Sequence, residues 1–283
     1  MKPISVQIAL ELAVNETQVL AAIELLDGGA TVPFVARYRK EITGGLDDAQ
    51  LRMLEERLRY LREMEKRRAA IISSIEDQDK MTDELRTSIL TADNKARLED
   101  LYLPYKPKRR TKAMIAREAG LEPLAHDLLA NPELNPETEA LRYLRTEVED
   151  DTAIADATAA LEGARQILVE QFAEDAQLVG SLRDYVWENA KLVSRVIEGK
   201  EADGAKFKDY FDYAEPINKV PSHRALAVFR GRKEEVLRVS IAVGDPDTPP
   251  RPHPCEIQIA NQFEISDQGR PADGWLLKVA GWA

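Results

Sequence analysis

The sequence has one cysteine, few aromatic residues and no long apolar run among its 283 residues. Its single thiol, Cys255, cannot form an intrachain disulfide or supply the cysteine pairs of a usual zinc site. No stretch of about 20 apolar residues is present, and the N-terminal residues lack the layout of a signal peptide. These absences lead us to expect a cytoplasmic protein without disulfides, bound metal or membrane segments.

Signatures of catalysis are missing as well. The three histidines, His126, His223 and His253, have no companion at a metal-ligand spacing. Ser222 lacks the Gly-x-Ser-x-Gly elbow of a hydrolase, and Cys255 has no group that would orient a neighbouring base. No glycine-rich phosphate loop lies between a strand and a helix. We therefore expect neither catalysis nor a cofactor, and a hydrolase is the least supported alternative.

The sequence is rich in charged residues. Charged residues make up 31% of the sequence and aromatic residues 6%, a composition that favours helices over an all-β fold. The net charge of −11 argues against a protein whose whole surface is coated by nucleic acid. Any nucleic-acid contact would therefore come from a local basic patch.

The best-defined helix is predicted to begin after Asp47. Asp47 and Gln50 form the pattern of a capping box, and Leu46 and Leu51 are placed to form a hydrophobic staple. The preceding turn contains Gly44 and Gly45, of which at least one is expected to have a positive φ.

This helix is predicted to be the central element of the fold. With about 29 residues it would be about 43 Å long, so several neighbours must cover it. Its apolar seam is interrupted at Glu65 and Arg68 and resumes at Ile72 and Ile75. The first part of the seam consists of Leu51, Leu54, Leu58 and Leu61.

Three short helices are predicted to precede the central helix. Asn15 and Gln18 form a second capping box, Gly28 is expected in a left-handed C-cap, and Pro33 suits the first turn of the third helix. Such an arrangement is typical of a helix-turn-helix-like bundle. The third helix would then present cations to nucleic acid, unless these charges only solvate an exposed face. The cations are Arg37, Arg39 and Lys40.

A basic loop, YKPKRRTK at residues 105–112, is the best local electrostatic signal in the sequence and the first candidate for a nucleic-acid contact, with the cations after residue 36 as the next. It holds five cations and no acid: Lys106, Lys108, Arg109, Arg110 and Lys112. Arginines hold phosphates bidentately, and several cations on one loop release several counterions on binding. Thr111 is predicted to cap the next helix, which closes at Gly120, so the loop would be held in place. The alternatives are a solvated loop and a loop that pairs with acidic helices of its own chain.

The rest of the chain is predicted to be helical as far as residue 190, with an alanine-rich stripe at 152–173. The acidic run EVEDD at 147–151 is interpreted as a solvated helix end. KLVSRVIEG and VLRVSIAV predict strands near 191 and at 236–243, and CEIQIANQFEI is a further alternating run. We predict a mainly α protein with an α-helical domain at 1–190 and a small mixed α/β portion at 191–283.

Three segments resemble the N-terminal region of the bacterial Tex proteins, which are transcription accessory proteins related to a eukaryotic transcription elongation factor. The segments are TVPFVARYRKEITGGLD (31–47), LEDLYLPYKPKRRTKAMIAREAGLEPLA (98–125) and SHRALAVFRGR (222–232). The resemblance implies that the chain is a fragment. Members of the family continue into an RNase H-like domain, helix-hairpin-helix modules and a C-terminal OB-type RNA-binding domain. It also implies that tight RNA or DNA binding belongs chiefly to that last domain.

We therefore expect a transcription accessory region without catalysis, which acts as a scaffold and makes weak, non-specific contacts to RNA or DNA. The alternative function is a protein-interaction scaffold that docks the transcription or translation machinery. A partner in the membrane is not expected.

Overall fold

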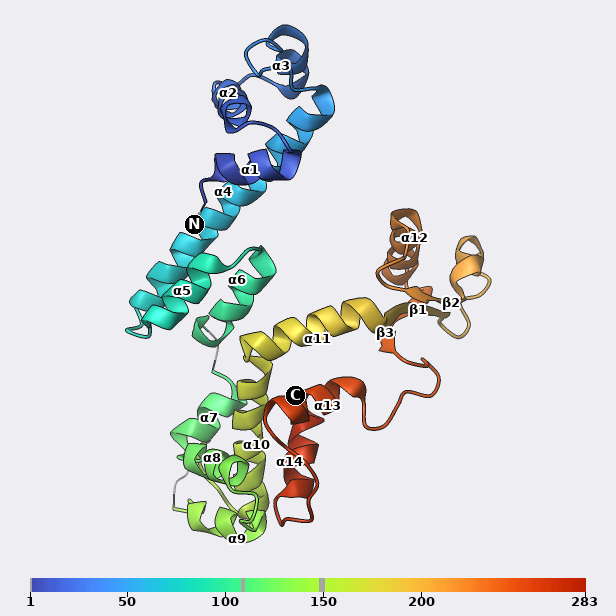
Figure 1. Ribbon diagram of the computed structural model, residues 1–283. Helices are drawn as coiled ribbons and strands as arrows, with labels where there is room; N and C mark the ends of the chain where they lie inside the picture. The colour runs from blue at the N-terminus through green and yellow to red at the C-terminus, as the bar shows by residue number, and fades with distance from the viewer. Residues whose placement is uncertain (1, 108–109, 148–150) are drawn as a thin grey trace. The chain divides into compact units, whose positions relative to one another are not determined.

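The computed structural model describes residues 2–107, 110–147 and 151–283. The chain divides into two compact units, Met1–Lys106 and Pro107–Ala283. Helices dominate both units, and the described residues contain one sheet of three strands, which confirms the mainly α prediction (Figure 1). Within the described ranges no single helix is long and apolar enough to cross a membrane. The first two helices meet that test only together, as a pair bent by 115°.

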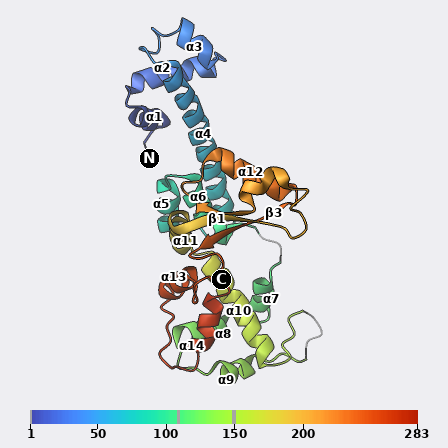
Figure 2. The same ribbon diagram turned by 90° about the vertical axis from the view of Figure 1, so that its right-hand side faces the viewer.

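The first unit is entirely helical in its described part. Its elements are α1 (Ile4–Leu12), α2 (Glu16–Asp27), α3 (Val32–Tyr38), α4 (Asp48–Glu76), α5 (Asp83–Thr91), α6 (Lys95–Tyr102) and the 3₁₀ turn η1 (Leu103–Tyr105). α4 is the long helix, and α1 to α3 pack on its first half while α5 and α6 pack on its second half (Figures 1 and 2).

The predicted start of α4 is confirmed in detail. The Asp47 carboxylate accepts a hydrogen bond from the Gln50 amide at 2.8 Å, and the Gln50 side chain accepts one from the Asp47 amide at 3.0 Å. Leu46 and Leu51 are both buried, as a staple requires. Gly44 and Gly45 have φ angles of 61° and 93°, so the turn before the cap uses the left-handed region as predicted.

The predicted interruption of the α4 seam is wrong. Arg68 is buried, and Ile71 rather than Ile72 continues the buried face. Arg68 can lie there because its guanidinium donates from Nε to the Ile89 carbonyl at 3.0 Å and from Nη2 to the Ala92 carbonyl at 2.7 Å. These carbonyls belong to the C-terminal end of α5, which would otherwise leave them without a partner. The arginine is therefore part of the packing between α4 and α5.

The N-terminal bundle forms one apolar cluster with the first half of α4. The left-handed residue after α2 is Gly29, with a φ of 86°, and the predicted Gly28 has an ordinary φ of −74°. The Gln18 side chain also ties α2 to the turn before α4, since its Nε2 donates to the Gly44 carbonyl at 2.8 Å. Central members of the cluster are Ile8, Val19, Val32, Val35 and Leu54.

The second unit begins and ends with helices. Its elements are α7 (Lys112–Glu118), α8 (Glu122–Ala130), α9 (Pro136–Ala140), the 3₁₀ turn η2 (Leu141–Tyr143), α10 (Ala157–Ala173), α11 (Ala176–Asn189), β1 (Ala190–Val196), the 3₁₀ turn η3 (Ala205–Tyr210), β2 (Asp212–Pro216), α12 (Ser222–Lys233), β3 (Leu237–Val243), α13 (Pro254–Gln262) and α14 (Asp273–Ala280).

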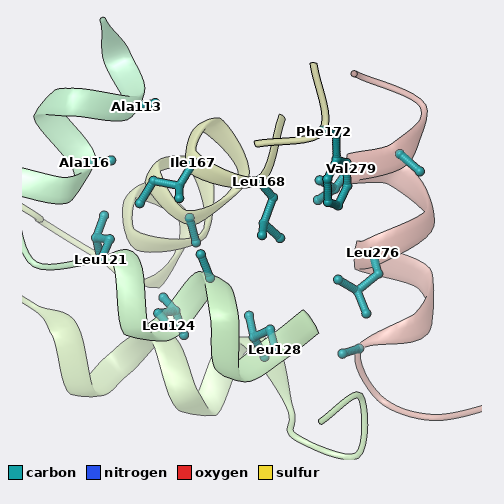
Figure 3. Close-up of a cluster of buried hydrophobic side chains, with 14 of the residues drawn as sticks. Ala113, Ala116, Leu121, Leu124, Leu128, Ile167, Leu168, Phe172, Leu276 and Val279 are labelled. Atoms are coloured by element: carbon teal, nitrogen blue, oxygen red, sulfur yellow. The ribbon is translucent and has the colours of Figure 1, made fainter. Parts of the chain in front are cut away.

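α10 is the centre of the helical core of this unit. Figure 3 shows Ile167, Leu168 and Phe172 of α10 between α7 and α8 on one side and α14 on the other. The alanine-rich stripe does bring helices close. A Cβ on Gly163 would lie 2.3 Å from a methyl group of Leu121, so a larger residue there would require the buried Leu121 side chain to move.

The segment CEIQIANQFEI, interpreted from the sequence as an alternating run, is helical as far as Gln262. Pro254 lies in the first turn of α13, and His253 Nδ1 accepts a hydrogen bond from the Cys255 amide at 3.2 Å, so the segment starts as a capped helix. Ile259 and Ala260 are buried in the same cluster as α10. A short run of alternating apolar residues fits both periods, and packing on the α10 cluster favours the helix.

The three strands are antiparallel, in the order β2–β1–β3. β1 and β3 confirm the two predicted strands, whereas β2 was not predicted. β1 begins at Ala190, the residue at which the helical part was expected to end. The division of the chain into domains at 1–190 and 191–283 stays a prediction, and α13 and α14 return to the helical core.

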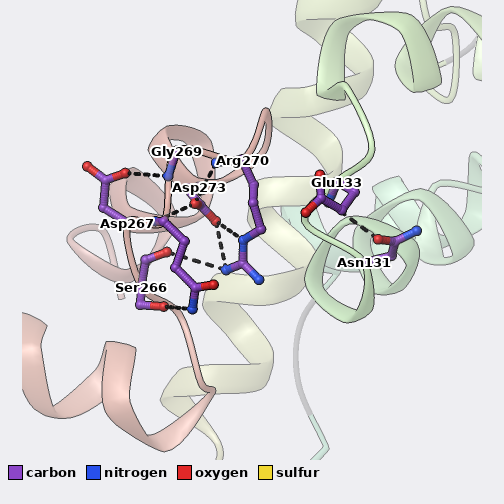
Figure 4. Close-up of polar contacts among 8 residues, drawn as sticks. Asn131, Glu133, Ser266, Asp267, Gly269, Arg270 and Asp273 are labelled. Atoms are coloured by element: carbon purple, nitrogen blue, oxygen red, sulfur yellow. Dashed lines mark hydrogen bonds and ion pairs between the residues drawn. The ribbon is translucent and has the colours of Figure 1, made fainter.

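A buried carboxylate positions α14. Asp273 is 1% exposed and accepts hydrogen bonds from the Gln268 amide at 2.7 Å, the Arg270 amide at 2.9 Å and Arg270 Nε at 2.9 Å (Figure 4). The bond to Arg270 lowers the pKa of Asp273. The Ala272 amide also donates to the Pro132 carbonyl at 3.0 Å, which joins this turn to the loop after α8.

The buried seam of α4 can be tested by truncating one of its members. Leu58 is 6% exposed, so Leu58→Ala should lower the free energy of unfolding by about 2–5 kcal/mol. The measurement is urea denaturation of the whole chain. Met53 on the same helix is 56% exposed, and Met53→Ala is the control that should change stability by less than about 0.5 kcal/mol. If the two changes have equal effects on stability, Leu58 is not part of the core.

A comparison of Arg68 with its neighbour Arg67 tests the hydrogen bonds of the buried guanidinium. Arg68→Met keeps most of the volume but leaves the Ile89 and Ala92 carbonyls without their donors, and should cost about 2–5 kcal/mol. Arg67 pairs with Glu99 at the surface, so Arg67→Met should cost about 1 kcal/mol or less. Thermal melts of both variants measure the difference, and a harmless Arg68→Met would contradict the hydrogen-bonding role.

Candidate nucleic-acid interface

The basic loop contains the sequence boundary between the two units, and its cations differ in their surroundings. Lys106 follows η1 and is exposed, and Lys112 is the exposed first residue of α7. Lys108 and Arg109 lie outside the described residues, so their role stays a prediction. Arg110 is described in full and has partners of its own.

Arg110 pairs with acids of its own unit. Its guanidinium lies 2.5 Å from a carboxylate oxygen of Glu118 on α7 and 2.5 Å from one of Asp151. Hydrogen bonds to these two carboxylates raise the pKa of Arg110. The alternative of pairing within the chain therefore applies to this residue. Asp151 belongs to the acidic run 147–151, which was interpreted from the sequence as a solvated helix end. The described residues of this run lie in turns, so that interpretation is wrong for them.

The end of the loop is held as predicted. The Thr111 hydroxyl caps α7 by accepting from the Met114 amide at 3.1 Å, and it donates to Glu170 of α10 at 3.0 Å. Arg117 pairs with the same Glu170 at 2.5 Å. Gly120 closes α7 with a φ of 82°. Acids of α7 and α10 thus neutralise much of the charge around the start of α7.

The other predicted cations lie at the end of α3. Arg37 is in the last turn of the helix, Arg39 is its C-cap and Lys40 follows in the turn, so only the first of the three belongs to the helix itself. All three side chains are exposed. Together with Phe34 and Tyr38 they form what we call the α3 surface.

The cations of the α3 surface have no carboxylate partner within the described chain. Arg39 donates from Nη1 to the Tyr38 carbonyl at 3.1 Å, and its guanidinium lies 5.5 Å from the centre of the Phe34 ring. Glu41 is the one acid in residues 31–46, and no ion pair joins it to these cations in the described structure. The α3 surface is therefore a local positive patch on an acidic chain.

The arginines of α4 show the contrast. Arg57 and Arg62 hold Glu11 of α1 and Asp27 of α2 through two hydrogen bonds each, at 2.6–2.7 Å. The bonds from Arg62 lower the pKa of Asp27. These guanidinium groups stabilise the packing of the bundle and are not available to a phosphate without loss of the pair.

The aromatic half of the α3 surface was not predicted from the sequence. Phe34 and Tyr38 are 41% and 57% exposed, and their ring centres lie 5.4 Å apart with the rings tilted by 45°. The spacing of these residues in the sequence was enough to predict that they share one face of the helix. Val32 and Val35 are the buried positions of α3, so residues four apart at 34 and 38 share the outer face.

A second group of cations was missed because strand pairing brings it together. Lys200, Arg232 and Arg238 line a groove of about 560 Å³, and Glu235 is an acid in the same lining. Arg238 of β3 is directly opposite Arg195 of β1, and Arg195 is paired with Asp212 at 2.6 Å. These residues come from two segments of the chain, 195–200 and 232–238, and no local pattern in the sequence links the two.

The reactive residue types are not gathered into a site. His253 Nδ1 serves as the helix cap described above, and burial raises the pKa of the Cys255 thiol beside it. Ser222 and His223 are the first residues of α12. Among the described residues no group of three or more His, Cys, Asp and Glu side chains could hold a metal ion.

Comparison with known families identifies the chain. Residues 2–76 match the family model described as Tex-like protein N-terminal domain, and residues 131–283 match the one described as Tex central region-like. The chain belongs to the Tex family. The resemblance carried by the three sequence segments is thereby confirmed. The α3 surface lies in the first matched segment, and the basic loop lies between the two matched segments in the sequence.

Relatives of this Tex-family chain include longer proteins. Protein YhgF of Escherichia coli (strain K12) is 56% identical over 277 residues, which are 97% of this chain and 35% of that protein. Transcriptional accessory protein Tex of Neisseria gonorrhoeae is 57% identical over 258 residues, 91% of this chain and 33% of that protein. S1 RNA-binding domain-containing protein 1 of Homo sapiens is 31% identical over 232 residues, 79% of this chain and 22% of that protein. The chain spans about a third of the length of these two bacterial relatives.

Proposed function

We propose that this chain is a non-catalytic region of a transcription accessory protein and makes auxiliary contacts to RNA or DNA through the α3 surface. One observation carries the proposal. Arg37, Arg39 and Lys40 are exposed and lack carboxylate partners in the described structure, on a chain whose net charge is −11. Cations that no acid neutralises can exchange condensed counterions of a phosphate backbone.

The binding is weak and nearly independent of sequence. The cations hold phosphates and reach no defined set of base edges, so they position the backbone and do not read the bases. Because the net charge of −11 opposes long-range attraction, the dissociation constant should be about micromolar or weaker, as for other non-specific contacts.

The basic loop has a secondary role in this proposal. Lys106 and Lys112 are exposed and can add phosphate contacts, and Lys108 and Arg109 are further candidates from the sequence. Arg110 contributes less, because a phosphate would have to compete with Glu118 and Asp151 for its guanidinium.

A protein-interaction scaffold is the second candidate function, and one observation favours it. Leu226 and Phe229 of α12 are 70% and 49% exposed, so this helix presents apolar side chains to solvent. Contiguous exposed apolar side chains mark surfaces that dock another protein, and residues three apart on a helix are neighbours. On this alternative the partner would be the transcription or translation machinery.

The proposed function predicts a salt dependence that distinguishes the two basic regions. The triple change Arg37→Ala, Arg39→Ala and Lys40→Ala should weaken binding to single-stranded RNA and to duplex DNA. It should also reduce the slope of log K against log salt concentration by about 2, since up to three phosphate contacts are lost. Arg110→Ala should change the slope by less than about 1, because this cation is already paired. Fluorescence anisotropy over a series of salt concentrations measures both.

Two further arms decide the outcome. All of the substituted side chains are exposed, so thermal melts should coincide with that of the parent chain to within about 0.5 kcal/mol. Binding that the triple change leaves intact would move the contact away from α3. If the parent chain shows no salt-dependent binding but binds purified RNA polymerase, and if Leu226→Ser with Phe229→Ser abolishes that binding, the protein scaffold is the correct function.

A further inference from the structure

The α3 surface combines two features that the proposed function uses only in part. α3 buries Val32 and Val35 against the bundle and leaves two aromatic side chains on its outer face. Aromatic side chains are among the largest contributors to core packing when buried, so their exposure here forgoes that stabilisation. Phe34 and Tyr38 also form a pair, with ring centres 5.4 Å apart. The outer face of α3 is therefore an aromatic surface bordered by cations.

The aromatic surface is held on a rigid support. Pro33 lies in the first turn of α3, and the following turn is packed by Thr43, which is fully buried and donates to the Lys40 carbonyl at 3.2 Å. The bond from Gln18 to the Gly44 carbonyl at 2.8 Å joins that turn to α2. A backbone that is already positioned loses little conformational entropy when a ligand binds.

We infer that the α3 surface binds single-stranded nucleic acid, with unpaired bases stacked on Phe34 and Tyr38 and the adjoining phosphates held by Arg37, Arg39 and Lys40. This inference rests on the proposed function and adds the class of ligand to it. Single-strand-binding proteins combine the same two components, a positive track for the backbone and aromatic rings for the bases.

The rings account for the choice of a single strand. In a duplex each base is stacked between its neighbours, so its faces are not accessible to a protein ring, whereas the cations can hold the phosphates of either form. Stacking is tolerant of sequence because every base has an aromatic face. A loss of one stacked base corresponds to about 5- to 150-fold in affinity.

Charge favours nucleic acid over an apolar peptide as the occupant. A surface that docks a hydrophobic segment needs apolar residues at its centre and gains nothing from three unpaired cations of one sign. Glu41 is the single acid near them in the sequence, and the rest of the chain carries an excess of acids. The ligand that complements this surface is an anion with flat aromatic groups.

The test separates the rings from the charges in the whole chain. The variant Phe34→Leu with Tyr38→Leu keeps apolar, helix-favouring side chains but removes both rings. It should bind a labelled single-stranded oligouridylate or oligothymidylate at least about tenfold more weakly than the parent chain. Its binding to a duplex of equal length and the salt slope should not change, because all three cations remain. The exchange Phe34→Tyr with Tyr38→Phe keeps two rings and is the matched control, with expected single-strand affinity close to that of the parent.

An abasic strand provides a second measurement that needs no variant. The parent chain should bind an abasic oligonucleotide as weakly as the leucine variant binds the complete one, since both lack the stacking contact. Thermal melts verify that the variants are folded.

Each possible outcome bears on one statement. Equal single-strand affinity of the leucine variant and the parent would overturn the stacking inference, as would a preference of the parent for duplex, while salt-dependent binding would continue to support the proposed function. If the leucine variant loses RNA polymerase binding but binds oligonucleotides as well as the parent does, the rings dock a protein, and this result would also overturn the inference. Absence of salt-dependent binding to every nucleic acid tested would remove the proposed function itself.

Discussion

The buried seam of α4 is the constraint on which the first unit depends. A 29-residue helix presents an apolar face about 43 Å long, which no neighbour of ordinary length can cover alone. The chain solves this with two groups of short helices, α1 to α3 on the first half and α5 with α6 on the second. Arg68 belongs to this solution, because its guanidinium occupies a seam position and also satisfies carbonyls at the end of α5. In the second unit α10 has the same function, and its small residues allow α7 and α8 to approach closely.

The distribution of charge follows from this architecture. Arginines on α4 pair with acids on the helices that cover it, and Arg110 and Arg117 pair with acids of α7, α10 and the turn at Asp151. Individually such exposed pairs contribute little to stability, about 1 kcal/mol or less. Their effect on function is larger, since they remove cations from the part of the surface that an anion can use. The α3 surface differs because α3 is short and ends in a turn without a nearby carboxylate partner among the described residues.

Membership of the Tex family gives these observations a context. The chain spans about a third of the length of its bacterial relatives YhgF and Tex, and the contact that we propose at the α3 surface concerns only the part of those proteins that this chain matches. A weak and sequence-independent contact is useful in that setting. Linking it to another binding module raises the overall affinity through effective concentration, without any new specific interaction.

Local chemistry determined what could be predicted from the sequence alone. The capping box of α4, the turn at Gly44 and Gly45, the start of α7 at Thr111 and two of the three strands depend on residues within a few positions of one another, and all were predicted correctly. The cations of the candidate site were also named from the sequence, since a run of basic residues is visible without a fold.

Only the tertiary structure decided which of these residues are buried, paired or free. Arg68 entered the core because carbonyls 21 and 24 residues later in the chain needed donors. Residues 254–262 became a helix because the α10 cluster had an apolar surface to cover. Asp151 removed Arg110 from the set of free cations across 41 residues of sequence. The aromatic pair on α3 became visible once Val32 and Val35 had taken the buried face. In each case the deciding partner is distant in the chain or set by packing, so propensity and periodicity could not report it.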